Sequence, residues 1–109
     1  MWTLVLYTAY RLSLKKTPKI RDIIEALHDQ LYLRYRISIY STRREIVQIL
    51  RNLEEHGLIK LKCHDDNVDE CIIELNYEKC RRIIETLEEY AKKRNTLLGE
   101  VFRIVRELA

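Results

Sequence analysis

Four side chains between positions 43 and 51 could recognise the edges of DNA bases: Arg43, Arg44, Gln48 and Arg51. Arginine presents a bidentate donor fork to guanine, and glutamine can pair with adenine in a similar bidentate way. Thr42 directly precedes them, and a helix beginning there would bring its hydroxyl and its free N–H groups close to phosphate. The same residues also suit the solvated face of an ordinary helix, so these chemical types alone do not decide between the two interpretations.

The segment from 42 to 56 is predicted to be the helix that carries these side chains. Thr42 and Glu45 have the spacing of a capping box, in which each side chain satisfies a free backbone N–H of the first turn. Gly57 can adopt the left-handed conformation that ends many helices. Apolar residues recur every three to four positions and predict one buried stripe: Ile46, Ile49, Leu50 and Leu53.

The residues before position 42 predict two further helices and a turn. Residues 2–12 are apolar on nearly every side, so we expect an internal helix that buries Leu4, Val5, Ala9, Tyr10 and Leu12. Thr17 and Pro18 are typical of an N-cap and a first helical residue, and the second helix should continue toward Tyr35. Residues 36–40 then alternate, which predicts an extended turn that buries Ile37 and Ile39.

After Gly57 the sequence predicts a β-hairpin with strands at about 58–64 and 70–75. A polar tip, which includes Asp65, Asp66 and Asn67, separates them. One register places every apolar residue of the hairpin on the same face: it pairs Ile59 with Leu75, Leu61 with Ile73, and Cys63 with Cys71.

The stretch from Leu53 to Ile59, together with the order of three helices and a hairpin, resembles the winged helix-turn-helix DNA-binding family. The layout is similar to PadR-like and MarR-like regulators and to small winged-helix proteins of archaea and their viruses. This resemblance covers roughly residues 4–75 and implies an α+β, mainly helical fold whose 1–75 domain binds double-stranded DNA. It implies a sequence-specific transcriptional regulator with helix 42–56 in the major groove. The short strand that usually lies between the first two helices is not evident.

The distribution of charge favours a polyanionic partner for the first half of the chain. Residues 1–62 contain 12 Lys+Arg and 6 Asp+Glu, whereas the remainder contains 8 and 11, although the net charge is only +3. Lysines near the second helix and on the hairpin are candidate phosphate contacts: Lys15, Lys16, Lys19, Lys60 and Lys62. The carboxylates of Asp65, Asp66, Asp69 and Glu70 would repel phosphate, so the tip of the hairpin should stay off DNA or face a protein.

Residues 76–109 are predicted to form a helical dimerisation segment. From Tyr77 to Leu108 apolar residues follow a seven-residue repeat, interrupted by Arg94, and a single three-helix domain would leave them uncovered. The predicted dimer interface comprises Cys80, Ile84, Leu87, Leu98, Val101, Val105 and Leu108. A two-fold dimer would place its recognition helices about 34 Å apart on DNA. Arg94, Asn95 and Thr96 could instead divide the segment in two.

The three cysteines, Cys63, Cys71 and Cys80, could form a disulfide in two ways. Cys63 and Cys71 face each other in the predicted hairpin, and Cys80 lies on the predicted seam, where a two-fold axis could bring it to its counterpart. Buried free thiols are the simpler alternative. With His64 these cysteines lack the spacing of a zinc site, so no metal or other cofactor is expected.

The sequence contains no nucleophile elbow, metal-binding helix pair or glycine-rich phosphate loop, which predicts a protein that is not an enzyme. No run is apolar enough to cross a membrane, and the opening residues lack the features of a signal peptide. We therefore expect a cytoplasmic protein, in the host cytoplasm if viral, with no identifiable small-molecule effector. The main alternative is a winged-helix module that binds another protein instead of DNA, and a third is an RNA-binding winged helix.

Overall fold

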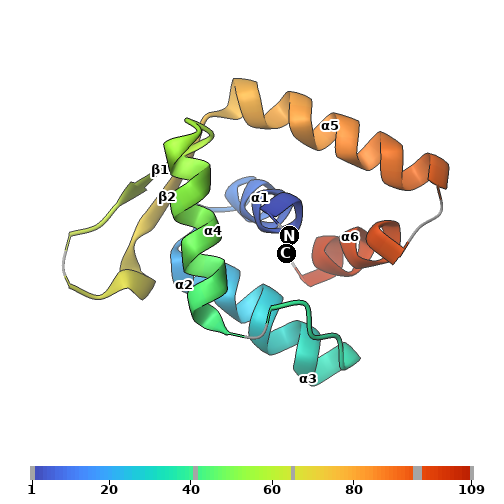
Figure 1. Cartoon of the computed structure of the whole chain (residues 1–109), viewed down its shortest axis with the longest axis horizontal. Helices are drawn as coiled ribbons and strands as arrows, with labels where there is room; N and C mark the ends of the chain where they lie inside the picture. The colour runs from blue at the N-terminus through green and yellow to red at the C-terminus, as the bar shows by residue number, and fades with distance from the viewer. Residues whose placement is uncertain (1, 41, 65, 95–96, 109) are drawn as a thin grey trace.

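The computed structural model describes residues 2–40, 42–64, 66–94 and 97–108, and its other helices surround α1, Trp2–Ser13 (Figure 1). Every side chain from Leu4 to Ala9 is buried, which agrees with the predicted internal helix. Thr8 is the polar member of this run, and its hydroxyl donates a hydrogen bond to the carbonyl of Leu4 over 2.8 Å. α1 can therefore pack on several sides at once without an unsatisfied hydroxyl at Thr8.

The second helical region follows α1 and consists of α2, Ile20–Ile24, a π-helical segment, Glu25–Gln30, and α3, Leu31–Tyr35. It ends at Arg36, which is left-handed with φ 56°, so the predicted end near Tyr35 is correct. The predicted start at Thr17 and Pro18 is wrong. Lys19 is the N-cap, and the carbonyl of Pro18 accepts a hydrogen bond from the backbone of Ile73 over 2.9 Å. Pairing with the hairpin keeps these residues extended and delays the helix.

The predicted helix 42–56 is α4, Arg43–Glu55, with Thr42 as its N-cap. The hydroxyl of Thr42 accepts a hydrogen bond from the backbone N–H of Glu45 over 3.3 Å, as half of the predicted capping box requires. The stripe of Ile46, Leu50 and Leu53 is buried, while Ile49 is half-buried. Gly57 has φ 75°, a conformation that favours glycine, so the predicted end of the helix is confirmed.

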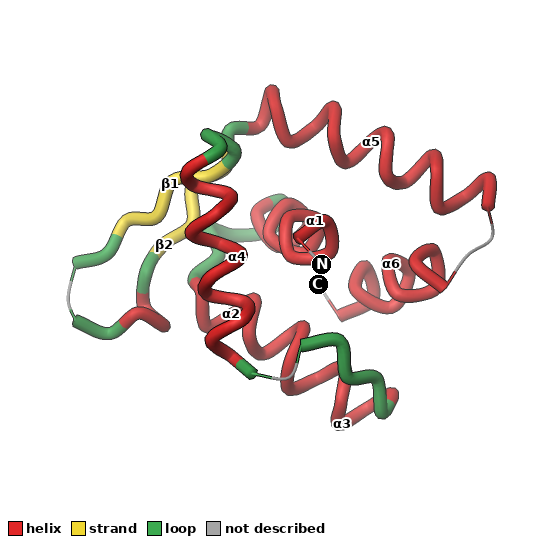
Figure 2. The backbone as a smooth tube through the Cα atoms, viewed as in Figure 1, coloured by secondary structure: helices red, strands yellow, loops and turns green. Residues whose placement is uncertain are grey.

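The hairpin is formed by β1, Ile59–Lys62, and β2, Ile72–Leu75, drawn in yellow in Figure 2. Their antiparallel register pairs Ile59 with Leu75 and Leu61 with Ile73, as predicted. Both strands are shorter than expected, and a 3₁₀ turn at Val68–Glu70 includes the predicted first residue of the second strand. A disulfide joins Cys63 to Cys71 beyond the paired residues, with 4.3 Å between their Cα atoms. The predicted hairpin cysteine pair is therefore confirmed.

The C-terminal segment forms two helices, α5, Tyr77–Arg94, and α6, Leu97–Leu108. A single long helix is therefore wrong, and the alternative of a segment divided in two agrees with the structure. α6 turns back beside α5 and both contact α1 (Figures 1 and 2). The predicted break includes Asn95 and Thr96, which lie outside the described residues. Most of the predicted interface is internal: buried or half-buried within this chain are Cys80, Ile84, Leu87, Val101, Val105 and Leu108. The side chain of Leu98 lies outside the described residues.

This arrangement corrects the reasoning behind the predicted dimer interface. Most described members of the apolar repeat do not require a partner chain, because α6 folds back and they join the core that includes α1. Residues on both sides of the predicted boundary at 75/76 belong to one hydrophobic core, so this boundary does not separate two cores. No helix among the described residues is both long and apolar enough to span a bilayer.

Candidate nucleic-acid interface

The outward face of α4 carries Arg44, Gln48 and Arg51, all of them exposed. Their spacing of four and three residues places them on one side of the helix, opposite the buried stripe. They extend over about 10 Å of the helix axis at 1.5 Å per residue. Because the buried stripe fixes this helix against the core, its outward face is held in a defined position.

Arg44 and Arg51 are the charged groups of this face with no partner of their own. Among the residues that the structure describes, neither guanidinium forms an ion pair or a side-chain hydrogen bond. Gln48 donates through Nε2 to Oδ1 of Asn52 over 3.1 Å, one turn along the helix. This contact holds the amide of Gln48 on the outward face and leaves its own oxygen available as an acceptor.

Arg43, the fourth predicted base contact, lies on a different side of α4. One of its guanidinium nitrogens is 3.5 Å from a carboxylate oxygen of Asp29, in the π-helical segment. The side chain remains exposed, but Asp29 offsets part of its charge and draws it away from Arg44 and Arg51. The structure therefore groups Arg44, Gln48 and Arg51 and sets Arg43 apart.

Thr42 and the first turn of α4 form the exposed N-terminal end of this face. The oxygen of Thr42 is already the acceptor for Glu45, so its predicted phosphate contact would have to use the hydroxyl proton as a donor. Tyr40, just before this turn, is buried, although the alternation of residues 36–40 placed it opposite Ile37 and Ile39. Those two isoleucines are half-buried, so sequence alternation identified only part of the packing in this turn.

Lys19, predicted to contact phosphate, is instead paired with the hairpin. Its ammonium lies 2.8 Å from one carboxylate oxygen of Glu70, and the guanidinium of Arg21 pairs with the other. The hydrogen bond from Lys19 holds the pKa of Glu70 below its usual range, and the charge of Arg21 lowers it further. The predicted acidic hairpin thus neutralises two cations at the start of α2.

The remaining lysines differ in their availability. Lys62 pairs with Glu74 across the hairpin over 2.8 Å, whereas Lys60 and Lys16 are exposed and form no ion pair among the described residues. Lys15 is exposed and lines a groove with Lys16 beside Leu12 and the end of α6. The tip residue Asp65 lies outside the described residues.

The cysteines offer no thiolate cluster to this surface. Cys63 and Cys71 are joined by the disulfide, and the third cysteine, Cys80, is buried with its Sγ 3.2 Å from the carbonyl of Leu58. The predicted bridge between Cys80 and the same residue of a second chain is therefore wrong for the folded protein, because this thiol packs inside its own core. Burial also raises the pKa of the Cys80 thiol.

A separate group of side chains around Tyr7 was not identified from the sequence. Tyr7 is fully buried on α1, and the charges of Glu88 on α5 and Arg106 on α6 both act on its hydroxyl. Nothing in the spacing of these residues signals the group, because it forms only when α6 folds back toward α1. The described chain is thus an α+β, mainly helical protein with an exposed arginine face on α4. No family model matches the chain, and no curated protein or solved structure matches it either.

Proposed function

We propose that this protein is a winged-helix protein that binds double-stranded DNA with α4 in the major groove and acts as a sequence-specific transcriptional regulator. The observation that carries the proposal is the pair of exposed, unpartnered guanidinium groups of Arg44 and Arg51, with Gln48 between them. The major groove admits an α-helix, and arginine and glutamine are the side chains that pair bidentately with guanine and adenine. The buried stripe of α4 supports this role, because a helix that is fixed against the core presents its side chains at a fixed spacing.

The contacts that hold the hairpin also favour the winged-helix proposal. Lys19 forms a single antiparallel bridge with Ile72, and backbone hydrogen bonds flank it on both sides. This pairing lies between α1 and α2, where no strand is evident from the sequence. The backbone of Leu61 also donates to the carboxylate of Glu54 over 2.7 Å, which fixes the hairpin beside the end of α4. A hairpin held in this position could approach phosphates that flank the groove.

The homodimer is not part of this proposal, because the described residues that were expected to form its interface are buried or half-buried within the chain. A single copy would contact one half-site, and its affinity should depend strongly on salt because phosphate contacts release counterions. Lys60 on β1 and Lys16 before α2 are the lysines best placed to contribute, since both remain without an ion pair in the described part of the chain.

The test is binding to fluorescent duplexes, first a random pool and then the sequences selected from it, at two salt concentrations. Arg44→Ala and Arg51→Ala should each weaken binding to selected duplexes by about 1 to 3 kcal/mol, with a smaller effect on random duplexes. Arg103→Ala is the matched control, because this exposed arginine lies on α6 and is held by Glu100 and Glu107. Equal affinity of all three variants and the wild type for selected duplexes would refute the proposed role of α4.

One observation favours the alternative of a protein-binding module. At the end of α3, Tyr32, Leu33 and Tyr35 are exposed large hydrophobic residues, with Leu33 63% exposed. Tyrosine and arginine are both enriched in protein interfaces, and the guanidinium of Arg36 lies over the ring of Tyr32 at 5.5 Å. If no duplex binds at low salt, this surface becomes the leading candidate for the working face.

A further inference from the structure

A groove with a volume of about 610 Å³ lies beside the second helical region, where the π-helical segment continues into α3. Its lining includes Leu27 and Tyr40, which are buried, and Tyr32 and Leu33, which are exposed. π-Helical segments are rare and occur frequently at functional sites. Figure 1 shows α3 at the edge of the molecule, away from the hairpin and from α5. The α3 surface, which comprises this groove and the exposed residues from Tyr32 to Arg36, thus presents apolar side chains that no part of the described chain covers.

The charges along the α3 surface are separated by sign. Glu25 and Asp29 lie in the π-helical segment, whereas Arg34 and Arg36 lie at the other end of the helix. Asp29 already has a partner, because its carboxylate is 3.5 Å from the guanidinium of Arg43. In the part of the chain that the structure describes, Glu25, Arg34 and Arg36 are exposed and form no ion pair. One end of this surface is therefore acidic and the other is basic.

The acidic, apolar and basic groups lie along one side of the helix. Glu25, Asp29 and Leu33 follow one another at intervals of four residues, and all three line the groove. The guanidinium of Arg36 lies 5.5 Å from the centre of the Tyr32 ring, which lines the same groove. Along this side the surface changes from acidic through apolar to basic.

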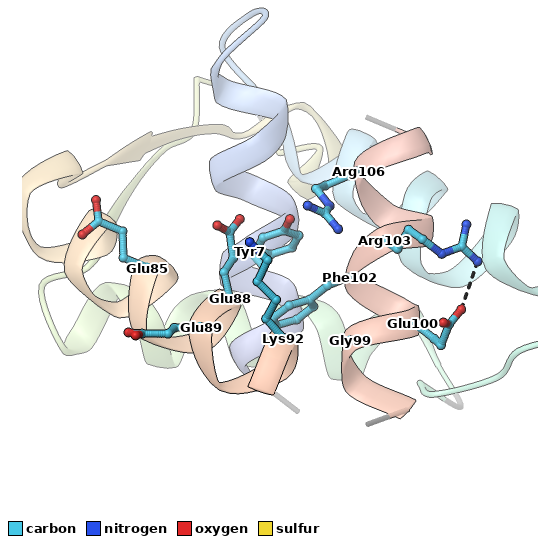
Figure 3. A pocket seen from close by; sticks show the side chains of 10 residues that line it. All are labelled: Tyr7, Glu85, Glu88, Glu89, Lys92, Gly99, Glu100, Phe102, Arg103 and Arg106. Atoms are coloured by element: carbon cyan, nitrogen blue, oxygen red, sulfur yellow. Dashed lines mark hydrogen bonds and ion pairs between the residues drawn. The ribbon is translucent and has the colours of Figure 1, made fainter. Parts of the chain in front are cut away.

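The groove between α5 and α6 differs in both respects, although its volume of about 520 Å³ is similar (Figure 3). Both of its walls carry carboxylates and cations, and Arg103 is held by Glu100 and Glu107 over 3.0 Å. Its aromatic lining residues, Tyr7 and Phe102, are stacked on each other and almost completely buried. This groove has neither exposed apolar side chains nor separated charges, so the α3 surface is the stronger candidate for binding a partner.

The order of the charges restricts what can cover the α3 surface. A basic segment would be repelled by Arg36, and an acidic segment or a nucleic acid strand would be repelled by Glu25. A complementary partner must place a cation opposite Glu25, a carboxylate opposite Arg36 and apolar side chains between them. The α3 surface itself has this order when its helix runs in the opposite direction.

We propose that the α3 surface binds the α3 surface of a second copy of this chain, with the two helices antiparallel about a two-fold axis. Glu25 and Arg36 are equally far along the chain from a point between residues 30 and 31. A two-fold axis beside that point brings Glu25 of each copy opposite Arg36 of the other, so the same ion pair forms twice. Leu33 of each copy then lies over the groove of the other. This association uses none of the residues first expected at a dimer interface, and it does not depend on DNA binding.

The first test is the molecular mass of the full chain, freed of nucleic acid, by light scattering and sedimentation equilibrium from micromolar to millimolar concentration. The wild type should form a dimer that dissociates on dilution. Leu33→Asp should raise the dissociation constant about tenfold or more, because it places a charge in the apolar part of the interface. Its circular dichroism spectrum should not change, since Leu33 is exposed within the chain. Leu14→Asp is the matched control, because Leu14 is also exposed but lies just after α1, and it should alter the constant within about twofold.

Charge reversal tests the antiparallel pairing. Glu25→Arg and Arg36→Glu should each weaken the dimer about tenfold or more, because like charges then face each other at two symmetric places. An equal mixture of the two variants should form a heterodimer, and a chain that carries both changes should again form a homodimer, since opposite charges face each other in both cases. Failure of both combinations to recover the dimer would overturn the proposal, as would equal effects of Leu33→Asp and Leu14→Asp. A wild type that stays monomeric at every concentration would also overturn it and would leave the α3 surface to a partner of another kind.

Discussion

Tyr7 is a buried side chain whose ionisation should make the stability of the folded protein depend on pH. Its ring stacks on Phe102 in the core, and its buried hydroxyl lies within the influence of the Glu88 carboxylate on α5. Burial is the main reason that the pKa of this hydroxyl rises to about 12, and the negative charge of Glu88 adds to the shift. The phenolate form is therefore disfavoured in the folded protein, whereas in the unfolded chain it forms at the ordinary pKa of about 10.

This difference predicts a loss of stability at high pH. The folded-state pKa of Tyr7 is raised, so its contribution is fully present below pH 10 and is lost as the pH rises from about 10 toward 12. In that window Tyr7 should lower the free energy of unfolding by up to about 1.4 kcal/mol per pH unit. Urea unfolding of wild type and Tyr7→Phe at pH 8 and pH 11 would measure it. The wild type should fall further than the variant, and parallel decreases would contradict the assignment.

Local signals at single residues were read correctly where neighbours along the chain decide the conformation. Thr42 caps α4, and Gly57 ends it with φ 75°. Both effects are local, because the hydroxyl of Thr42 bonds to the first turn of the helix and glycine, which has no Cβ, adopts a positive φ without strain. Tyr40 could not be placed in this way, because its burial depends on contacts made after the whole chain has folded. The surroundings of the Tyr7 hydroxyl depend likewise on the position of α6, which carries Arg106.

Among the elements, the hairpin was the most predictable and the C-terminal helices were the least. The alternation of apolar residues on each strand left one register that buries a single face, and the structure has that register. The seven-residue repeat after Tyr77 described an apolar face correctly but did not identify what covers it. A repeat of this kind cannot distinguish a partner chain from a helix that folds back within its own chain.

The disulfide should stabilise the hairpin element by a measurable amount. Cys63 and Cys71 are separated by eight positions, and closing a loop of this size is worth about 2 to 3 kcal/mol in the chain-entropy description. Cys63→Ser with Cys71→Ser should therefore lower the free energy of unfolding by about this amount, measured in urea under non-reducing conditions. Cys80→Ser is not a suitable control, because this thiol is buried in the core.

Thiol counting provides the control for that experiment. In the unfolded, non-reduced wild type a thiol reagent should modify one cysteine, Cys80, and after reduction it should modify all three. In the folded protein Cys80 should react slowly, because it is buried and its pKa is raised. Three reactive thiols before reduction would rule out the disulfide.

The hairpin also controls how much positive charge α2 presents. Glu70 binds both Lys19 and Arg21, so removing its charge should release two cations toward a phosphate backbone. Glu70→Gln should therefore strengthen binding to random duplexes at low salt and steepen its salt dependence by up to about two counterions. Glu74→Gln is the matched control, because it releases only Lys62 and should produce a smaller change. Weaker binding by Glu70→Gln would indicate that this pairing is needed to position the hairpin.

At the scale of the whole molecule, α1 is the element on which the others depend. It contacts α4, α5 and α6, and its buried residues share one core with residues of both C-terminal helices. A chain of 109 residues has a modest core, so the burial provided by α6 is a substantial share of the whole. The C-terminal segment should therefore be required for folding, where the sequence alone suggested that it was required for association.

Val105→Asp distinguishes these two roles. Val105 is fully buried within the chain, so a carboxylate at this position would be removed from water. Since single domains are stable by only about 5 to 15 kcal/mol, we expect this variant to be largely unfolded by circular dichroism, with no cooperative thermal transition. Arg103→Ala, an exposed change two residues away, should retain the wild-type transition within about 1 kcal/mol. A Val105→Asp chain that stays folded and changes only from dimer to monomer by light scattering would instead place this residue in an interface between chains.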